Sequence, residues 1–160
     1  YNVGIDGRTI LTLLHVRISQ YNYPLTAVVL DWNGTVTDSE GSLRKDVRPF
    51  LKRRKKEGRI IAIASDQDPF HIHQEMEQQG FKPSFFGAYF YCRPGARKDI
   101  RRISKELEVD PRHLIVFGDN HYIDLNSAKR AGSATVLMKG VYGDGVENFR
   151  NLEWIFDYSK

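Results

Sequence analysis

The sequence is organised around Ala27-Val28-Val29-Leu30-Asp31-Trp32-Asn33-Gly34-Thr35-Val36-Thr37-Asp38, an apolar run followed by polar and turn-forming residues. Such a run is typical of a strand buried on both faces. The strand brings Asp31 to its carboxyl end, where open α/β sheets bind ligands. Gly34 allows the backbone to turn sharply beside a ligand. A carboxylate in this place can act as a nucleophile, although a lone Asp-x-Asn-Gly is more often an ordinary turn.

The composition indicates one soluble domain. With 160 residues, the chain can bury roughly 70% of its unfolded surface. We expect a single domain over residues 1–160, with a core at about 26–139 and extensions at 1–25 and 140–160 that pack on it. The net charge of +4, from 24 basic and 20 acidic residues, favours an anionic substrate without indicating nucleic acid.

The cellular compartment is inferred from features that the sequence lacks: a cysteine pair, a membrane span and a secretory signal. Cys92 is the one cysteine, which excludes an internal disulfide and fits a reducing environment. The sequence shows no apolar run near the roughly 18–20 residues of a membrane span, and no secretory signal pattern. We therefore expect a cytoplasmic protein.

Strand and helix patterns alternate along the chain. Apolar runs predict strands near 27–30, 60–64, 88–91, 113–117 and 134–138. Helical spacing predicts helices over 43–56 and 69–79, from Gly95 to the break at Asp110-Pro111, and around 124–131; the third helix would carry Arg97 and Lys98. Residues 10–18 fit either a strand or a helix. The alternation predicts a doubly wound, Rossmann-like parallel sheet with helices on both faces.

Three features have a structural and a functional interpretation. The basic run 52–56 suits a helix C-terminus, where the dipole favours cations; the alternative is a binding patch for nucleic acid or acidic lipid. His71 and His73 would point to different faces of a helix, so we expect surface residues rather than joint metal ligands. The aromatic stretch 149–158 is expected to pack within the monomer, or else to form a subunit contact.

Polar residues follow several of the predicted strands. They are Asp31, Ser65, Lys98, Asp119 and Asp124. Carboxyl ends of parallel strands lie at one edge of a sheet, so these side chains can converge. Phosphoryl transfer needs such a set: a nucleophile, clamps for the phosphoryl oxygens and carboxylates for Mg²⁺. Each residue alone has a simpler interpretation, as a helix cap, a solvated lysine, a turn residue or a first-turn acid.

In this order, the residues resemble the haloacid dehalogenase superfamily of phosphatases and phosphotransferases. The resemblance spans about 26–139. Its four motifs are similar to Asp31-Trp32-Asn33-Gly34-Thr35, the strand ending on Ser65, Lys98, and Gly118-Asp119 with Asp124.

The resemblance implies a role for each matching residue. Asp31 would accept the phosphoryl group as an aspartyl-phosphate. The backbone carbonyl of Asn33 would join Asp31 and Asp119 around Mg²⁺, supported by Asp124. Ser65 and Lys98 would contact the phosphoryl group, with Arg97 as a rival for Lys98; Gly34 and Asp66 complete the expected substrate site.

The short segments between the motifs leave no room for a cap domain. The layout resembles that of the small magnesium-dependent phosphatases. The implied partner is a phosphorylated substrate, which is a small molecule, a lipid headgroup or a macromolecule. A homo-oligomer would be one way to cover the open site. Neither a nucleic-acid motif nor a membrane span is expected.

Asn33 departs from the family pattern. Hydrolytic members have an Asp at this position that protonates the leaving oxygen and later deprotonates the attacking water. An amide cannot exchange protons in this way, and loss of a general acid–base costs about 10²–10⁴-fold in rate. The alternatives are a slow phosphatase, a phosphatase for substrates whose leaving group needs no protonation, a phosphate- or partner-binding pseudoenzyme, and an engineered Asp-to-Asn variant of a phosphatase. A phosphoaccepting receiver domain is disfavoured, because its metal-binding acids precede the acceptor in sequence.

Overall fold

The computed structural model describes residues 12, 14–18 and 23–157. Within them, the strands form one six-stranded sheet in the order β1-β6-β5-β2-β3-β4. These strands are β1 (Val16–Arg17), β2 (Ala27–Leu30), β3 (Ile60–Ser65), β4 (Ala88–Tyr91), β5 (Leu114–Gly118) and β6 (Ala134–Leu137). All neighbouring strands run parallel except β1, which pairs antiparallel with β6. The predicted doubly wound sheet is confirmed, and β1 extends it by an edge strand.

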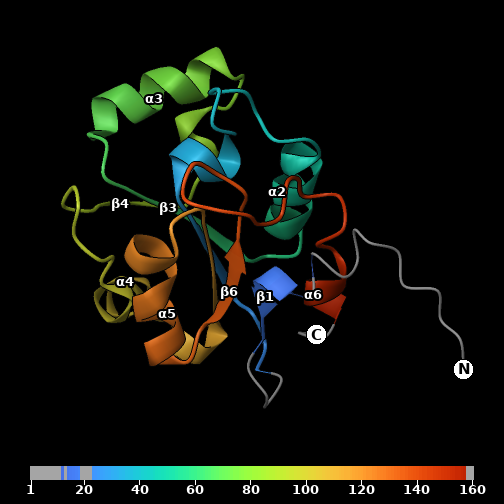
Figure 1. The fold of residues 1–160 in the computed structure, drawn as a ribbon, viewed down its shortest axis with the longest axis vertical. Coiled ribbons are helices and arrows are strands. Elements are labelled where there is room, and N and C mark those ends of the chain that lie inside the picture. Colours follow the sequence, from blue (N-terminus) through green and yellow to red (C-terminus); the bar gives the residue numbers. More distant parts are fainter. Residues whose placement is uncertain (1–11, 13, 19–22, 158–160) are drawn as a thin grey trace, which may run out of the picture.

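Helices cover both faces of this sheet (Figure 1). They are α2 (Val47–Lys56), α3 (Pro69–Gln78), α4 (Ile100–Leu107), α5 (Asn126–Ala131) and α6 (Trp154–Asp157). Short helical turns lie between them: η1 (Trp32–Val36), η2 (Pro83–Phe85), η3 (Pro111–His113) and η4 (His121–Leu125). Among the described helices, none has the length and apolar character that crossing a membrane requires.

Strand β2 shows how the sheet divides the core. Successive side chains of a strand point to opposite faces. Val28 and Leu30 pack in the core under α2, α3 and α6, whereas Ala27 and Val29 pack in the core under α4 and α5. All four residues of β2 are buried, which explains why the strand is a continuous apolar run.

The C-terminal aromatic residues complete the first of these cores. Phe50 of α2 lies 5.0 Å from Phe149 and 5.6 Å from Phe156, measured between ring centroids. Phe149 also stacks on Phe117 of β5, with 5.6 Å between centroids. Packing of these aromatic residues within the monomer is therefore confirmed for Phe149 and Phe156, whereas Tyr158 lies outside the described residues.

The helix predicted over 43–56 begins later than expected. Leu43 forms a bridge with Thr37, and α2 starts only at Val47. The cause is a turn in which the Asp38 carboxylate accepts hydrogen bonds from the backbone N–H groups of Glu40 and Ser42, at 2.9 and 3.0 Å. The apolar spacing that included Leu43 was therefore misleading.

The prediction that a helix carries Arg97 and Lys98 was wrong, because that helix begins after them. Helix α4 begins at Ile100, because the Asp99 carboxylate caps it by accepting from the Arg102 N–H at 3.1 Å. Arg97 and Lys98 thus lie on the preceding loop. At the next strand, His113 belongs to η3, and β5 begins one residue later.

The basic run 52–56 is partly buried. Arg54 is buried, pairs with Glu57 and Glu153 at 2.7 and 2.5 Å, and lies over the rings of Phe50 and Phe156. The Lys55 ammonium donates to the Phe85 carbonyl at 2.8 Å. The run ends α2, as the structural interpretation predicted.

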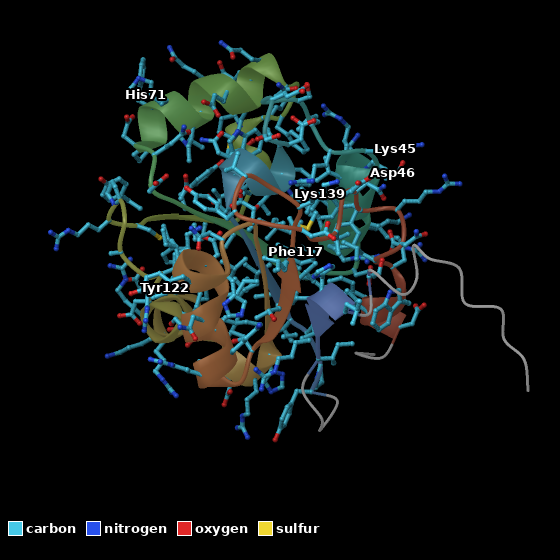
Figure 2. All side chains as sticks on the ribbon, in the orientation of Figure 1. Lys45, Asp46, His71, Phe117, Tyr122 and Lys139 are labelled. Atoms are coloured by element: carbon cyan, nitrogen blue, oxygen red, sulfur yellow. The ribbon has the colours of Figure 1, made fainter. Side chains whose placement is uncertain are left out.

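The two histidines of α3 differ in their surroundings. His71 is exposed at one end of the helix (Figure 2), where it contacts the Asp68 carboxylate. His73 is half-buried, with its ring centroid 4.9 Å from that of Tyr89. The prediction of a surface residue is therefore confirmed for His71, whereas His73 is partly buried.

We predict that Phe149→Ala lowers the free energy of unfolding by about 3–5 kcal/mol, because it leaves a cavity between α2 and β5. Urea denaturation would measure this loss. Phe70→Ala is the matched control, since Phe70 is 67% exposed, and we expect it to change stability by less than about 0.5 kcal/mol. Equal effects of the two variants would contradict the packing described for the C-terminal segment.

Candidate active site

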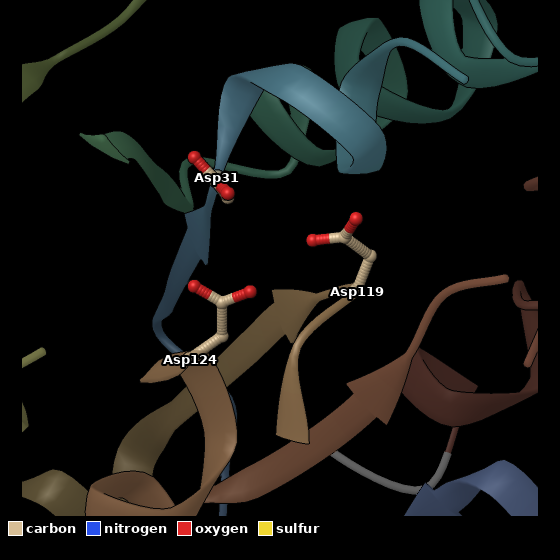
Figure 3. Close-up of side chains that lie close together, drawn as sticks. All are labelled: Asp31, Asp119 and Asp124. Atoms are coloured by element: carbon tan, nitrogen blue, oxygen red, sulfur yellow. The ribbon is translucent and has the colours of Figure 1, made fainter. Parts of the chain in front are cut away.

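Three carboxylates meet at the carboxyl edge of the sheet (Figure 3). Asp31 directly follows β2, Asp119 directly follows β5, and Asp124 lies in η4. One carboxylate oxygen from each lies within 4.8 Å of those from the other two. The convergence follows from parallel pairing, because β2 and β5 are neighbours whose carboxyl ends lie one residue apart in register.

Glycines make this close approach possible. A Cβ on Gly34 would lie 2.2 Å from Asp119 Oδ2, and Gly34 has a φ of +76°. A Cβ on Gly118 would lie 2.3 Å from the Cβ of Asp124. Gly34 is thus required both for the left-handed turn after Asp31 and for the space that Asp119 occupies.

Lys98 is the cation that contacts this cluster directly. Its ammonium lies 2.8 Å from Asp124 Oδ1 and 3.4 Å from Asp31 Oδ1, and it donates to the Ala64 carbonyl at 2.6 Å. Arg97, its rival in the sequence, is exposed, and its guanidinium lies 4.2 Å from the centre of the Tyr122 ring. Of the two residues, Lys98 is therefore the one that faces the carboxylates.

The electrostatics of the cluster favour a further cation. Burial raises the pKa of Asp31 to about 7, and repulsion from Asp124 and Asp119 adds to this effect against the attraction of Lys98. Burial and the neighbouring Asp124 also raise the pKa of Asp119. Burial alone would lower the pKa of Lys98, but Asp31 and Asp124 raise it. One lysine does not balance three carboxylates, and carboxylate oxygens are the ligands that Mg²⁺ prefers.

The cluster lies in an open cavity of about 590 Å³. Asn33 is exposed and lines this cavity beside Asp31 and Gly34. Further lining residues include Asp66, Cys92, Arg93, Lys98, Asp119, Asp124, Val141 and Tyr142. A substrate that enters the cavity would therefore meet both the carboxylates and the amide at position 33.

Ser65 lies at the end of β3, and its hydroxyl hydrogen-bonds within its own turn rather than with the carboxylates. Ser65 is buried at the end of β3, and its hydroxyl oxygen accepts from the Gln67 N–H at 3.2 Å. Its neighbour Asp66 is exposed and lines the cavity. Ser65 thus supports the turn after β3, and the interpretation of Ser65 as a helix cap is wrong, because Asp68 caps α3. The Ser65 hydroxyl proton remains available as a donor.

Arg44 is part of this site, and the sequence analysis missed it. Its side chain is buried, donates to the Gly34 carbonyl at 2.7 Å and to the Glu147 carbonyl at 2.9 Å, and also donates to the Lys139 carbonyl. These partners are up to 103 positions away in the sequence. No local pattern around Arg44 distinguishes it from the other basic residues of the segment.

Similarity to solved structures supports this fold. No protein-family model and no curated protein matches the sequence. A hydrolase from Streptococcus pneumoniae is 13% identical with a TM-score of 0.62, over 83% of this chain and 98% of that one. A haloacid dehalogenase-like family hydrolase from Xanthomonas campestris is 18% identical with a TM-score of 0.51, over 64% of this chain and 43% of that one.

A third structure was solved with ligands. It is the 3-deoxy-D-manno-octulosonate 8-phosphate phosphatase from Moraxella catarrhalis, in complex with a magnesium ion, a phosphate ion and KDO. It is 16% identical with a TM-score of 0.52, over 87% of this chain and 90% of that one. The chain has the fold of the haloacid dehalogenase superfamily, as its motifs predicted.

We predict that Gly34→Ala destabilises the protein more than Gly41→Ala does. Both glycines have positive φ, of +76° and +85°, so both alanines carry about 1–2 kcal/mol of backbone strain. A Cβ at Gly41 meets nothing within 4 Å, whereas one at Gly34 displaces Asp119. Urea unfolding of the two variants would isolate the cost of this contact, and equal losses would show that Asp119 does not need the space.

Proposed function

We propose that this protein is a Mg²⁺-dependent phosphatase that acts through an aspartyl-phosphate on Asp31. The observation that carries the proposal is the meeting of Asp31, Asp119 and Asp124, with the Lys98 ammonium against two of them. The phosphatase from Moraxella catarrhalis, whose structure contains magnesium and phosphate, supports the same chemistry.

The proposed metal ligands are the carboxylates of Asp31, Asp119 and Asp124 and the backbone carbonyl of Asn33. When bound, Mg²⁺ would neutralise negative charge on the carboxylates and on the phosphoryl oxygens. The three close carboxylates fit such an ion, because without it their charges repel one another.

The first proposed step forms the phosphoenzyme. An oxygen of Asp31 attacks phosphorus, a P–O bond forms, and the bond to the leaving oxygen breaks with its electron pair. Lys98 stabilises the charge on Asp31 and on the phosphoryl group. In the second step, water attacks phosphorus, releases phosphate and restores the carboxylate. Both steps need a proton transfer, for the leaving oxygen and for the attacking water respectively.

Asn33 limits both proton transfers, because its amide neither donates nor accepts a proton at neutral pH. A leaving group that is stable as an anion, such as nitrophenolate, would still depart in the first step. The second step would then be slow, since nothing at position 33 activates the water. The proposal therefore implies a chain that phosphorylates itself more readily than it turns over.

We predict a burst of about one nitrophenolate per chain when nitrophenyl phosphate is added with Mg²⁺, followed by slow turnover. Asn33→Asp should raise the steady-state rate by about 10²–10⁴-fold. Asp31→Asn or removal of Mg²⁺ by EDTA should abolish both phases. Stopped-flow absorbance would separate the burst from the steady state.

Asn151→Asp adds the same carboxylate to an exposed asparagine elsewhere on the surface and is the matched control. It should leave both phases unchanged. Turnover that survives Asp31→Asn would overturn the proposed nucleophile.

The second candidate is a phosphate- or partner-binding protein without turnover, and the exposed amide of Asn33 in the cavity favours it. It predicts phosphate binding by calorimetry, no burst, and no activity in Asn33→Asp. A phosphate on the chain that hydroxylamine releases, as expected of an acyl phosphate, would exclude it.

A further inference from the structure

Arg44 is a buried cation whose hydrogen bonds go to backbone carbonyls, and whose charge also attracts the Asp119 carboxylate. Its residue is only 6% exposed, and its guanidinium donates to carbonyls of two separate segments. One segment is the turn after Asp31, through the Gly34 carbonyl, and the other is the loop after β6, through the Lys139 and Glu147 carbonyls. Figure 2 labels Lys139 of this loop, and Lys45 and Asp46, the residues that follow Arg44.

The same two segments enclose the Asp119 carboxylate. A Cβ on Gly34 would lie 2.2 Å from Asp119 Oδ2, and a Cβ on Gly140 would lie 2.6 Å from the same oxygen. Asp119 therefore lies in a slot whose walls are the two glycines. Arg44 holds the carbonyl of Gly34 itself and that of Lys139, the residue directly before Gly140.

We infer that Arg44 is a positioning residue that fixes the width of this slot and thereby the orientation of Asp119 toward the metal. The inference rests on the proposed metal site. A planar guanidinium can hold several carbonyls in a fixed geometry, whereas a lysine ammonium is a point charge on a flexible stem. Partners that orient metal ligands typically contribute 10–100-fold to metal affinity.

Arg54 provides a matched comparison within the same part of the chain. It is likewise a buried arginine, 1% exposed, but its ion pairs are with Glu57 and Glu153 and its ring contacts are with Phe50 and Phe156. None of these residues lines the cavity. Loss of Arg54 should therefore reduce stability without reaching Asp119, which separates a general effect of burying an arginine from a specific effect on the metal ligand.

The experiment is a titration of the folded protein with Mn²⁺, in which electron paramagnetic resonance measures the free ion. We expect Arg44→Met to weaken Mn²⁺ binding by about 10–100-fold and Arg44→Lys to have an intermediate effect. Arg54→Met should bind Mn²⁺ as tightly as the unaltered chain. Circular dichroism at the titration temperature would confirm that each variant is folded.

A second variant tests the slot without touching Arg44. Gly140→Ala places a methyl group against Asp119, and we expect it to weaken Mn²⁺ binding to a similar extent. Gly87→Ala is its control, since a Cβ there has no neighbour closer than 3.6 Å. This pair tests the walls of the slot even where Arg44→Met does not fold, and Arg44→Lys then tests the arginine itself.

The outcomes distinguish this inference from the proposed function. Unchanged Mn²⁺ affinity in the Arg44 and Gly140 variants, together with lost affinity in Asp119→Asn, would overturn the role of Arg44 and leave the metal site standing. Equal affinity of the unaltered chain and Asp119→Asn would overturn the metal site and the inference together.

Discussion

Repulsion among three carboxylates is the constraint on which the rest of this structure depends. Asp31, Asp119 and Asp124 come within 4.8 Å of one another at an edge where burial disfavours charge. Such an arrangement persists only where the surrounding structure holds it in place. Rigid parallel strands provide two of the side chains, glycines provide the space, and the buried Lys98 offsets part of the charge. The remaining negative charge is what makes the edge suitable for a divalent cation.

The sheet could be predicted because its strands are buried on both faces. Burial on both faces requires uninterrupted apolar runs, and β2, β3 and β5 are such runs. The helix starts at α2 and α4 could not be predicted from apolar spacing, because they depend on single polar contacts. Asp38 forms a turn that excludes Leu43 from α2, and Asp99 caps α4 after Lys98. The short strand β1 could not be predicted, because the residues around it fit both a strand and a helical periodicity.

The site residues that follow from the order of the strands could be predicted from the sequence. Those that depend on contacts between distant segments could not. Asp31 and Asp119 follow neighbouring parallel strands, so their meeting follows from the strand order. The choice between Lys98 and Arg97 depends on which way each side chain of this loop points, and the sequence does not indicate that direction. The role of Arg44 could not be predicted from the sequence at all. Its partners are the carbonyls of Gly34, Lys139 and Glu147, and only the folded chain brings them together.

The hydrogen bond between Arg44 and the Gly34 carbonyl also bears on the deamidation of Asn33. An asparagine followed by glycine loses its amide when the glycine nitrogen attacks the side chain, which requires the intervening peptide to rotate. Here that peptide leads into a buried glycine whose carbonyl is anchored. We therefore expect the fold to slow this reaction relative to the unfolded chain. In molecules that have spent time unfolded, loss of ammonia would give a succinimide, and its hydrolysis would leave isoaspartate or aspartate at position 33. Repeated unfolding, rather than storage of the folded protein, would thus alter the chemistry of the cavity without any change in the gene.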